Sequence, residues 1–221
     1  MHGTRNNMYA VAVTILFKEG KFEELKDFFE ISGLPALESL RGDMHSIAFF
    51  NPKDNVNLGI AFMKDKETAD KFAEIRKENL MQIQDILDSS PAVYEGEMIT
   101  GKILKDSLIE ESKESLFLAF AKLDVKNADE YMSLQKEIYL PKLEEDEGII
   151  SYGAFKSDEN TLVLFEFWTS HDAKHDFDEK LNAEGNLYEK FMPLMNGFED
   201  YYGEPYAMRQ FSDFKAGRSI N

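Results

Sequence analysis

Residues 8–17 read MYAVAVTILF, and residues 115–124 read SLFLAFAKLD. Both are short apolar runs with β-branched and aromatic residues, which is the composition of a β-strand. Aligning the two runs pairs Ala12 with Ala119, and similar elements then follow each run in the same order. Self-similarity at a fixed distance indicates that one structural unit occurs twice in the chain.

The elements after the two runs correspond in type. Apolar residues at three- and four-residue spacing predict a helix after each run, and Pro141 is expected to kink or end the second one. Residues 45–50 (HSIAFF) and 150–155 (ISYGAF) each lead through a polar turn into another apolar run, which predicts an antiparallel hairpin. A longer helix follows each hairpin, with Asp65 and Ser170 as N-cap residues.

A last strand closes each copy with the same four-residue pattern, Tyr-x-Gly-Glu, at residues 94–97 and 201–204. Glycine within a strand often marks a bulge or a close backbone approach, which we expect at Gly96 and Gly203. The order is therefore strand, helix, strand, strand, helix, strand, twice over. This is the ferredoxin-like βαββαβ arrangement.

We expect an α+β fold of two tandem ferredoxin-like repeats, residues 1–101 and 115–208, with a charged linker at 102–114 and a tail at 209–221. A four-stranded antiparallel sheet with both helices on one face leaves its other face uncovered. An apolar face of this kind must be buried against something, and a second such sheet is the natural partner. The sequence thus predicts antiparallel sheets packed face to face as an internal pseudo-dimer.

Composition excludes several function classes. The 221 residues include 42 acidic and 25 basic ones, so the net charge of −17 disfavours partners such as nucleic acid and anionic membranes. The chain has no cysteine, which excludes disulfides, thiolate catalysis and iron–sulfur clusters. We expect a soluble cytoplasmic protein, because neither a signal peptide nor an apolar run of membrane-spanning length is evident.

Two segments of the second copy carry a family resemblance. Residues 147–152 (EGIISY) and residues 165–173 (FEFWTSHDA) resemble the second-strand entry and the third strand and turn of the antibiotic biosynthesis monooxygenase-like superfamily. The resemblance covers residues 8–208 in a fused tandem form and implies a dimeric α+β barrel. It also implies members of several kinds, namely cofactor-independent oxygenases of aromatic polyketides, haem-degrading oxygenases and small isomerases. By our alignment, Phe177 replaces the histidine that many members carry in the last helix.

Trp168 and Glu166 are the first candidates for a site. They share one strand face with Leu164, because residues two apart in a strand point the same way. A carboxylate beside an indole is unusual in a plain core, where an unpaired charge is costly. One interpretation is a ligand pocket in which Trp168 stacks on an aromatic substrate and Glu166 acts as a base. The alternative is a core tryptophan beside a glutamate that faces solvent.

Other polar residues extend this hypothesis. His171 and His175 stand four apart at the start of a helix and could transfer protons. This spacing is also used by metal pairs, but a solvated helix face is the simpler interpretation, so no metal site is predicted. Tyr152, Tyr201 and Tyr202 could donate phenol hydrogen bonds to a ligand, or they could be ordinary strand residues.

The leading functional hypothesis is a cofactor-independent monooxygenase-like enzyme that acts on an organic, aromatic small molecule in a pocket of the C-terminal repeat. Its substrate would need to form a carbanion that reduces O2 directly, with proton removal as the protein's main task. Two alternatives stay open. One is a non-catalytic protein that binds a hydrophobic ligand or a haem, and the other is a scaffold that assembles into a homo-oligomer.

Overall fold

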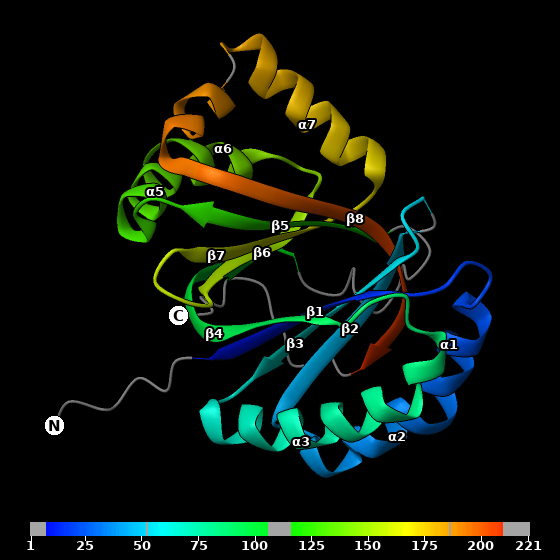
Figure 1. Ribbon diagram of the computed structural model, residues 1–221. Coiled ribbons are helices and arrows are strands. Elements are labelled where there is room, and N and C mark those ends of the chain that lie inside the picture. Colours follow the sequence, from blue (N-terminus) through cyan, green and yellow to red (C-terminus); the bar gives the residue numbers. More distant parts are fainter. Residues whose placement is uncertain (1–7, 52, 106–115, 186, 210–221) are drawn as a thin grey trace, which may run out of the picture. The chain divides into compact units, whose positions relative to one another are not determined.

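The structure, a computed structural model, describes residues 8–51, 53–105, 116–185 and 187–209 (Figure 1). These residues divide into two units. Unit 1 contains the chain up to Glu97 and the end of the last strand from Gly203, and unit 2 runs from Met98 to Tyr202. The predicted tail from residue 210 and residues 106–114 of the predicted linker lie outside the described residues.

Unit 1 begins with a strand, a helical segment and a hairpin, as predicted. Its elements are β1 (Tyr9–Leu16), α1 (Phe22–Phe28), a π-helical turn (Phe29–Gly33), α2 (Leu34–Ala36), a 3₁₀ turn (Leu37–Leu40), β2 (Met44–Asn51), β3 (Val56–Met63), α3 (Lys66–Gln82), a 3₁₀ turn (Gln84–Ile86) and the first half of β4 (Ala92–Ile103).

Unit 2 repeats this order. Its elements are β5 (Phe117–Val125), α5 (Ala128–Leu134), a π-helical turn (Gln135–Tyr139), α6 (Leu140–Glu145), β6 (Ile149–Lys156), β7 (Thr161–Trp168), α7 (His171–Ala183), two 3₁₀ turns (Leu187–Lys190 and Met192–Leu194) and the first half of β8 (Met195–Arg209).

Hydrogen bonds connect the eight strands in the order β1-β3-β2-β8-β5-β7-β6-β4, and β1 also pairs with β4. The two long strands each serve both units. The part of β4 up to Glu97 pairs with β1, whereas the part from Met98 pairs with β6. The part of β8 from Glu204 pairs with β2. The boundary between the units thus falls within β4, after Glu97, and within β8, after Tyr202.

The helices of unit 2 lie on one side of strands β5, β6 and β7 (Figure 1). Leu162, Leu164 and Trp168 of β7 pack into the core beneath these helices. Val163 and Phe165 alternate with them and point to the opposite face, where they are also buried. Both faces of this sheet thus carry apolar side chains removed from water.

Local capping signals place the helices. The Asp65 side chain accepts a hydrogen bond from the Thr68 amide, and the Ser170 side chain accepts one from the Ala173 amide, which confirms both predicted N-caps. The helical segment is interrupted just before Pro141 by the π-helical turn Gln135–Tyr139, and it continues past Pro141 to Glu145, so the proline does not end it. Pro141 sits in the first turn of α6, where its missing amide hydrogen costs no hydrogen bond.

Two glycines allow neighbouring groups in the sheets to approach more closely than a side chain would permit. A Cβ at Gly153 would lie 2.3 Å from Cζ of Phe165, so the Phe165 ring occupies the space above its cross-strand partner. A Cβ at Gly203 would lie 3.0 Å from the Phe50 carbonyl oxygen, which confirms the close backbone approach predicted there.

The fold is α+β with antiparallel ladders, as predicted. The element order is compatible with tandem ferredoxin-like repeats, and the face-to-face packing of their sheets stays a prediction. Within the described part of the chain, no helix combines the length and the apolar character needed to cross a membrane.

Candidate functional site

A cavity of about 390 Å³ lies within unit 2, between its sheet and its helices. Small residues of the strands, Ala119, Ala121 and Ala154, line it from the sheet. Tyr139 of the π-helical turn and Phe191, between the two 3₁₀ turns, line it from the other side. The short side chains on the sheet leave the space that larger residues would fill, so the cavity has the size of an organic-ligand site.

Glu166 extends from β7 into the lining of this cavity and is held by two donors. Nε1 of Trp168 donates to one carboxylate oxygen at 3.0 Å, and the Tyr139 hydroxyl donates to the other at 2.6 Å. Trp168 is fully buried and packs against Phe177, and this packing holds the indole ring in place. The two donors fix the carboxylate, and each oxygen keeps a lone pair for a further hydrogen bond.

Tyr139 stays a hydrogen-bond donor in this arrangement. Burial, together with the neighbouring Glu166 carboxylate, holds the pKa of Tyr139 well above its usual value. Burial also raises the pKa of Tyr131, which lines the same cavity, to about 12. These phenols therefore remain protonated over the whole physiological pH range.

A second polar cluster borders the cavity on α7. Nζ of Lys174 lies 2.6 Å from a carboxylate oxygen of Asp178, one helical turn away. The Tyr188 hydroxyl donates to the other oxygen of Asp178 at 2.7 Å. The Lys174 ammonium also lies 5.8 Å from the centroid of the Trp168 ring. Trp168 therefore contacts both Glu166, through its Nε1 donor, and Lys174, through its ring face.

Tyr152 lines the cavity from β6 and donates to Glu144, which also accepts from Lys102. Burial opposes the ionisation of Glu144, but the hydrogen bonds from Lys102 and Tyr152 outweigh it and lower the pKa of Glu144. Burial and the Glu144 carboxylate raise the pKa of Tyr152. The Glu144 carboxylate thus holds the Tyr152 ring in its position against the cavity.

The lowered pKa of Glu144 predicts a pH dependence of stability. The stabilisation is present above the unfolded-state pKa of about 4.3 and is lost as the pH falls through the lower folded-state pKa. We expect Glu144→Gln to reduce the melting temperature by about 2–4 °C at pH 7, since a partly exposed pair contributes about 1 kcal/mol or less. The difference should shrink as the pH falls below about 4.3 and vanish once Glu144 is protonated in the folded state. Melting curves from pH 3 to pH 7 check this.

The exposed neighbour Glu145 supplies the matched control for this prediction. Glu145→Gln should leave the melting temperature nearly unchanged at every pH. A Glu144→Gln difference that does not shrink as the pH falls would contradict the assignment, because protonated Glu144 no longer forms an ion pair with Lys102.

The exposed side chains that line the cavity are apolar, whereas its charged side chains are mostly acidic. Phe198 and Met192, whose side chains are 55% and 56% exposed, line it together with the partly exposed Tyr202. The charged lining residues of the described chain are three carboxylates and one ammonium, that of Lys174. Exposed large apolar side chains gathered at a cavity indicate a ligand with an apolar body. The excess of carboxylates favours an uncharged or cationic ligand over an anionic one.

The sequence-predicted residues divide between this cavity and other places. Glu166, Tyr152 and Tyr202 line the cavity, and Trp168 lies directly behind Glu166. Tyr201 packs near Phe120 instead, because successive strand residues point to opposite faces.

His171 and His175 do not line the cavity. Both side chains are more than half exposed on α7, where His171 lies near Asp172 and His175 near Glu179. The buried side of α7 carries Lys174, Phe177 and Leu181 instead. The structure therefore brings Glu166 and Trp168 together and leaves the histidines apart from them.

The residues that form the hydrogen bonds and the ion pair around the cavity include Tyr139, Lys174, Asp178 and Tyr188, none of which the sequence predicted as a site residue. For Lys174 and Asp178 of α7, the sequence does contain a pattern that indicates their pairing. Lys174 occupies the same three- and four-residue spacing as Phe177 and Leu181, and Asp178 follows it by one turn. A lysine on the apolar side of a helix with an acidic partner four residues later indicates a buried ion pair.

The residues of this cavity do not fit a haem. Haem iron is usually held by histidine, cysteinate, methionine or tyrosinate, and no histidine is among the described residues that line the cavity. Burial raises the pKa values of Tyr131, Tyr139 and Tyr188, which opposes a tyrosinate ligand. The three carboxylates of the lining would also repel the negatively charged propionates of a haem. Among the described residues, no group of three metal-binding side chains occurs either.

No family model and no curated protein sequence matches the chain. Solved structures do match. A provisionally named monooxygenase from Fusobacterium nucleatum subsp. nucleatum superposes with a TM-score of 0.74 at 15% identity, covering 96% of each chain. A provisionally named monooxygenase from Lactobacillus acidophilus gives a TM-score of 0.68 at 10% identity, covering 92% of this chain and 96% of its own.

An anthrone oxidase-like protein gives a TM-score of 0.67 at 13% identity and covers 97% of this chain and 98% of its own. Identities this low show a shared fold. The shared fold agrees with the α+β fold expected from the sequence.

Proposed function

We propose that unit 2 binds an uncharged, phenol-bearing aromatic compound and oxidises it with O2 as a cofactor-independent monooxygenase. The observation that carries this proposal is the position of Glu166, a half-buried carboxylate that lines an organic-sized cavity and is held by Trp168 and Tyr139. Fixing a proton acceptor in advance is how an active site lowers the barrier to deprotonation.

The cavity supports the proposed substrate class. Its apolar lining and its apolar mouth suit a fused-ring body, and Tyr152 and Gln135 offer polar contacts for hydroxyl or carbonyl groups. The carboxylates Asp178 and Asp200 disfavour an anionic ligand. The acidic lining thus favours a neutral phenol over an aromatic acid.

The proposed chemistry needs no external reductant. Glu166 takes one proton from an activated CH2 group, and the resulting carbanion gives an electron to O2. The radical pair combines into a C–O bond, and the peroxide anion recovers the proton from Glu166. Loss of water then converts the hydroperoxide into a carbonyl, so one oxygen atom ends in the product and the other in water. The substrate supplies all four electrons that reduce O2: two when the hydroperoxide forms, and two from its second C–H bond when water is lost.

The structural neighbours support the same class of reaction. Two of them are provisionally named monooxygenases and a third is named anthrone oxidase-like. A hydroxylated anthrone contains the activated CH2 group and the uncharged aromatic body that the cavity suits. It is therefore the first substrate to test.

The test follows oxygen uptake with 1,8-dihydroxyanthrone and subtracts the rate without protein. We expect saturable uptake and one carbonyl product per O2. Glu166→Gln keeps the size of the side chain and an acceptor for Tyr139, and should lower kcat by about 10²-fold or more, because it removes the proton acceptor. Glu179→Gln, on the exposed side of α7, is the matched control.

Other outcomes reject the proposal or part of it. Loss of activity in His171→Ala or His175→Ala, with Glu166→Gln unaffected, would move proton transfer to the exposed face of α7. Saturable binding of the anthrone without oxygen uptake would support the alternative of a non-catalytic ligand-binding protein. Absence of both binding and uptake would reject this ligand class for the cavity.

A further inference from the structure

Tyr131 of α5 and Gln135 of the following π-helical turn form a buried polar pair in the wall of the unit 2 cavity. The two residues are 4% and 6% exposed, and Nε2 of Gln135 donates to the Tyr131 hydroxyl oxygen at 3.3 Å. The hydroxyl hydrogen of Tyr131 and the second amide hydrogen of Gln135 then have no acceptor among the described residues. Buried donors normally have acceptors, so these two need an explanation.

The uncommitted groups of this pair lie at the open space of the cavity. The Gln135 amide oxygen also has no donor, yet it is not fully enclosed, because the only fully enclosed side-chain nitrogen or oxygen without a partner in the described chain belongs to Arg76. Since Gln135 lines the cavity, its amide group reaches this space. The Phe191 ring packs against the Tyr131 ring, with centroids 5.2 Å apart, and holds the phenol in the same wall.

The pair borders the same space as Glu166. Tyr131, Gln135 and Tyr139 follow one another at four-residue spacing, so they share one side of the helical segment, and all three line the cavity. Tyr139, the last of the three, donates to Glu166 at 2.6 Å. Burial raises the pKa of Tyr131, and the Glu166 carboxylate raises it further. The Tyr131 hydroxyl therefore keeps its hydrogen at neutral pH and lies within electrostatic reach of the proton acceptor.

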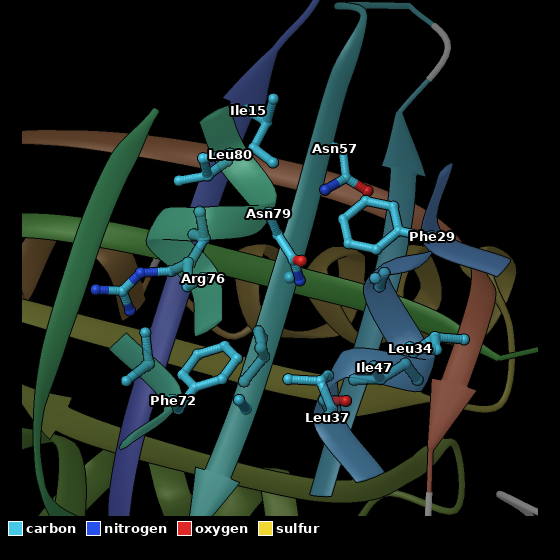
Figure 2. A pocket seen from close by; sticks show the side chains of 18 of the residues that line it. Ile15, Phe29, Leu34, Leu37, Ile47, Asn57, Phe72, Arg76, Asn79 and Leu80 are labelled. Atoms are coloured by element: carbon cyan, nitrogen blue, oxygen red, sulfur yellow. The ribbon is translucent and has the colours of Figure 1, made fainter. Parts of the chain in front are cut away.

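The first repeat shows that the fold does not require these polar groups. The helix and π-helical turn after the first strand have the same lengths in both units, seven and five residues. At the positions of Tyr131, Gln135, Tyr139 and Glu166, unit 1 has Leu25, Phe29, Gly33 and Ala61. Figure 2 shows Phe29 in the wall of the smaller cavity of unit 1. The donors and the carboxylate thus occur together in unit 2 and are replaced together in unit 1, which indicates a joint role.

We propose that Tyr131 and Gln135 donate hydrogen bonds to the ketone oxygen of the aromatic substrate and stabilise the negative charge that this oxygen gains. The inference rests on the proposed function. When Glu166 takes a proton from the CH2 group, the electron pair of the broken C–H bond is shared with the ketone oxygen across the ring, which becomes an enolate oxygen. Donors that are fixed in advance stabilise this anion more than the neutral ketone. When the former CH2 carbon forms its bond to oxygen, the ketone is restored.

Neutral donors suit a cavity with an acidic lining. Its three carboxylates disfavour an anionic ligand, but the reaction must form an anion in the same cavity. The hydroxyl of Tyr131 and the amide of Gln135 carry no net charge, so they act on the enolate without attracting anionic ligands. The inference narrows the substrate to an aromatic ketone whose oxygen can accept hydrogen bonds from the protein.

The test follows oxygen uptake by the full chain with two substrates, anthrone and 1,8-dihydroxyanthrone. The two hydroxyl groups of the second compound already donate to its own ketone oxygen, so this compound depends less on the protein donors. Tyr131→Phe and Gln135→Leu should each lower kcat with anthrone by about tenfold or more, but with 1,8-dihydroxyanthrone by about threefold or less. Ser133→Ala, which removes an exposed hydroxyl from the same helix, is the matched control and should change neither rate.

A second measurement does not depend on oxygen. In anaerobic solution at a fixed pH, absorbance gives the ratio of anionic to neutral anthrone bound to the protein. Tyr131→Phe and Gln135→Leu should each lower this ratio by about tenfold, and Ser133→Ala should leave it unchanged. A lowered ratio in a protein that takes up no oxygen would reject the proposed oxidation but retain the pair as an anion-stabilising site.

Three results would overturn the inference. Equal losses of kcat with both substrates would give the pair a structural role only. An unchanged ratio of anionic to neutral anthrone in both variants would mean that water in the cavity satisfies the donors. Oxygen uptake that depends on Glu166 but not on Tyr131 or Gln135 would reject the inference and keep the proposed function, whereas absence of anthrone binding would reject both.

Discussion

Asp178→Ala is expected to lower the free energy of unfolding by about 3 kcal/mol, because it leaves the buried Lys174 ammonium without its anion. The same change removes the acceptor of the Tyr188 hydroxyl. The Asp178 side chain is 28% exposed, so water can compensate in part. The expected loss therefore lies at the lower end of the range for breaking a buried ion pair.

The reciprocal variants make this prediction specific. Lys174→Met removes the cation but leaves Asp178 partly exposed and bonded to Tyr188, so it should cost about 1–2 kcal/mol. The double variant Lys174→Met/Asp178→Leu replaces the pair by apolar groups and should lie within about 1 kcal/mol of the wild type. Urea unfolding followed by circular dichroism measures all three. Asp176→Ala, an exposed aspartate of the same helix, should change stability by less than about 0.5 kcal/mol.

A loss from Asp178→Ala no larger than that from Asp176→Ala would show that Lys174 is solvated in solution. The cluster would then contribute no order to the cavity wall. A double variant as unstable as Asp178→Ala would locate the loss in packing and not in the unpaired charge.

Local patterns were sufficient to predict most elements of the fold. Strand alternation and helical spacing predicted the repeated order, and the caps at Asp65 and Ser170 followed from residue type alone. The pairing of β4 and β8 was beyond this reasoning. Alternation along a strand specifies which face is buried, but it carries no information on which neighbour each half of a 12- or 15-residue strand joins.

The candidate site was predictable where its residues are neighbours in sequence. Glu166 and Trp168 are two apart in one strand, so their shared face follows from the strand period, and their hydrogen bond follows from that face. Tyr139 donates to Glu166 from a helix 27 residues away, and no local pattern encodes that contact. The histidine spacing placed His171 and His175 on one side of α7, but spacing alone does not say whether that side is buried.

Trp168→Ala is expected to lower the free energy of unfolding of unit 2 by about 3–5 kcal/mol, the usual cost of removing a large buried aromatic side chain. Trp168→Phe keeps most of the packing against Phe177 but loses the Nε1 donor to Glu166. It should cost about 1–3 kcal/mol, because hydrogen bonds to charged groups contribute more than neutral ones. Phe198→Ala, an exposed aromatic of the same unit, should cost less than about 1 kcal/mol.

The comparison of the two Trp168 variants separates packing from positioning. Trp168 lies behind Glu166 and does not line the cavity, so it acts on a ligand through the carboxylate that it orients. Trp168→Phe should therefore lower kcat for the anthrone more than it raises KM. A loosely held Glu166 carboxylate still leaves room for the ligand, but it is less often in the position that allows proton transfer. Equal stability of the Trp168→Phe variant and the wild type, with unchanged kcat, would mean that Tyr139 alone holds Glu166.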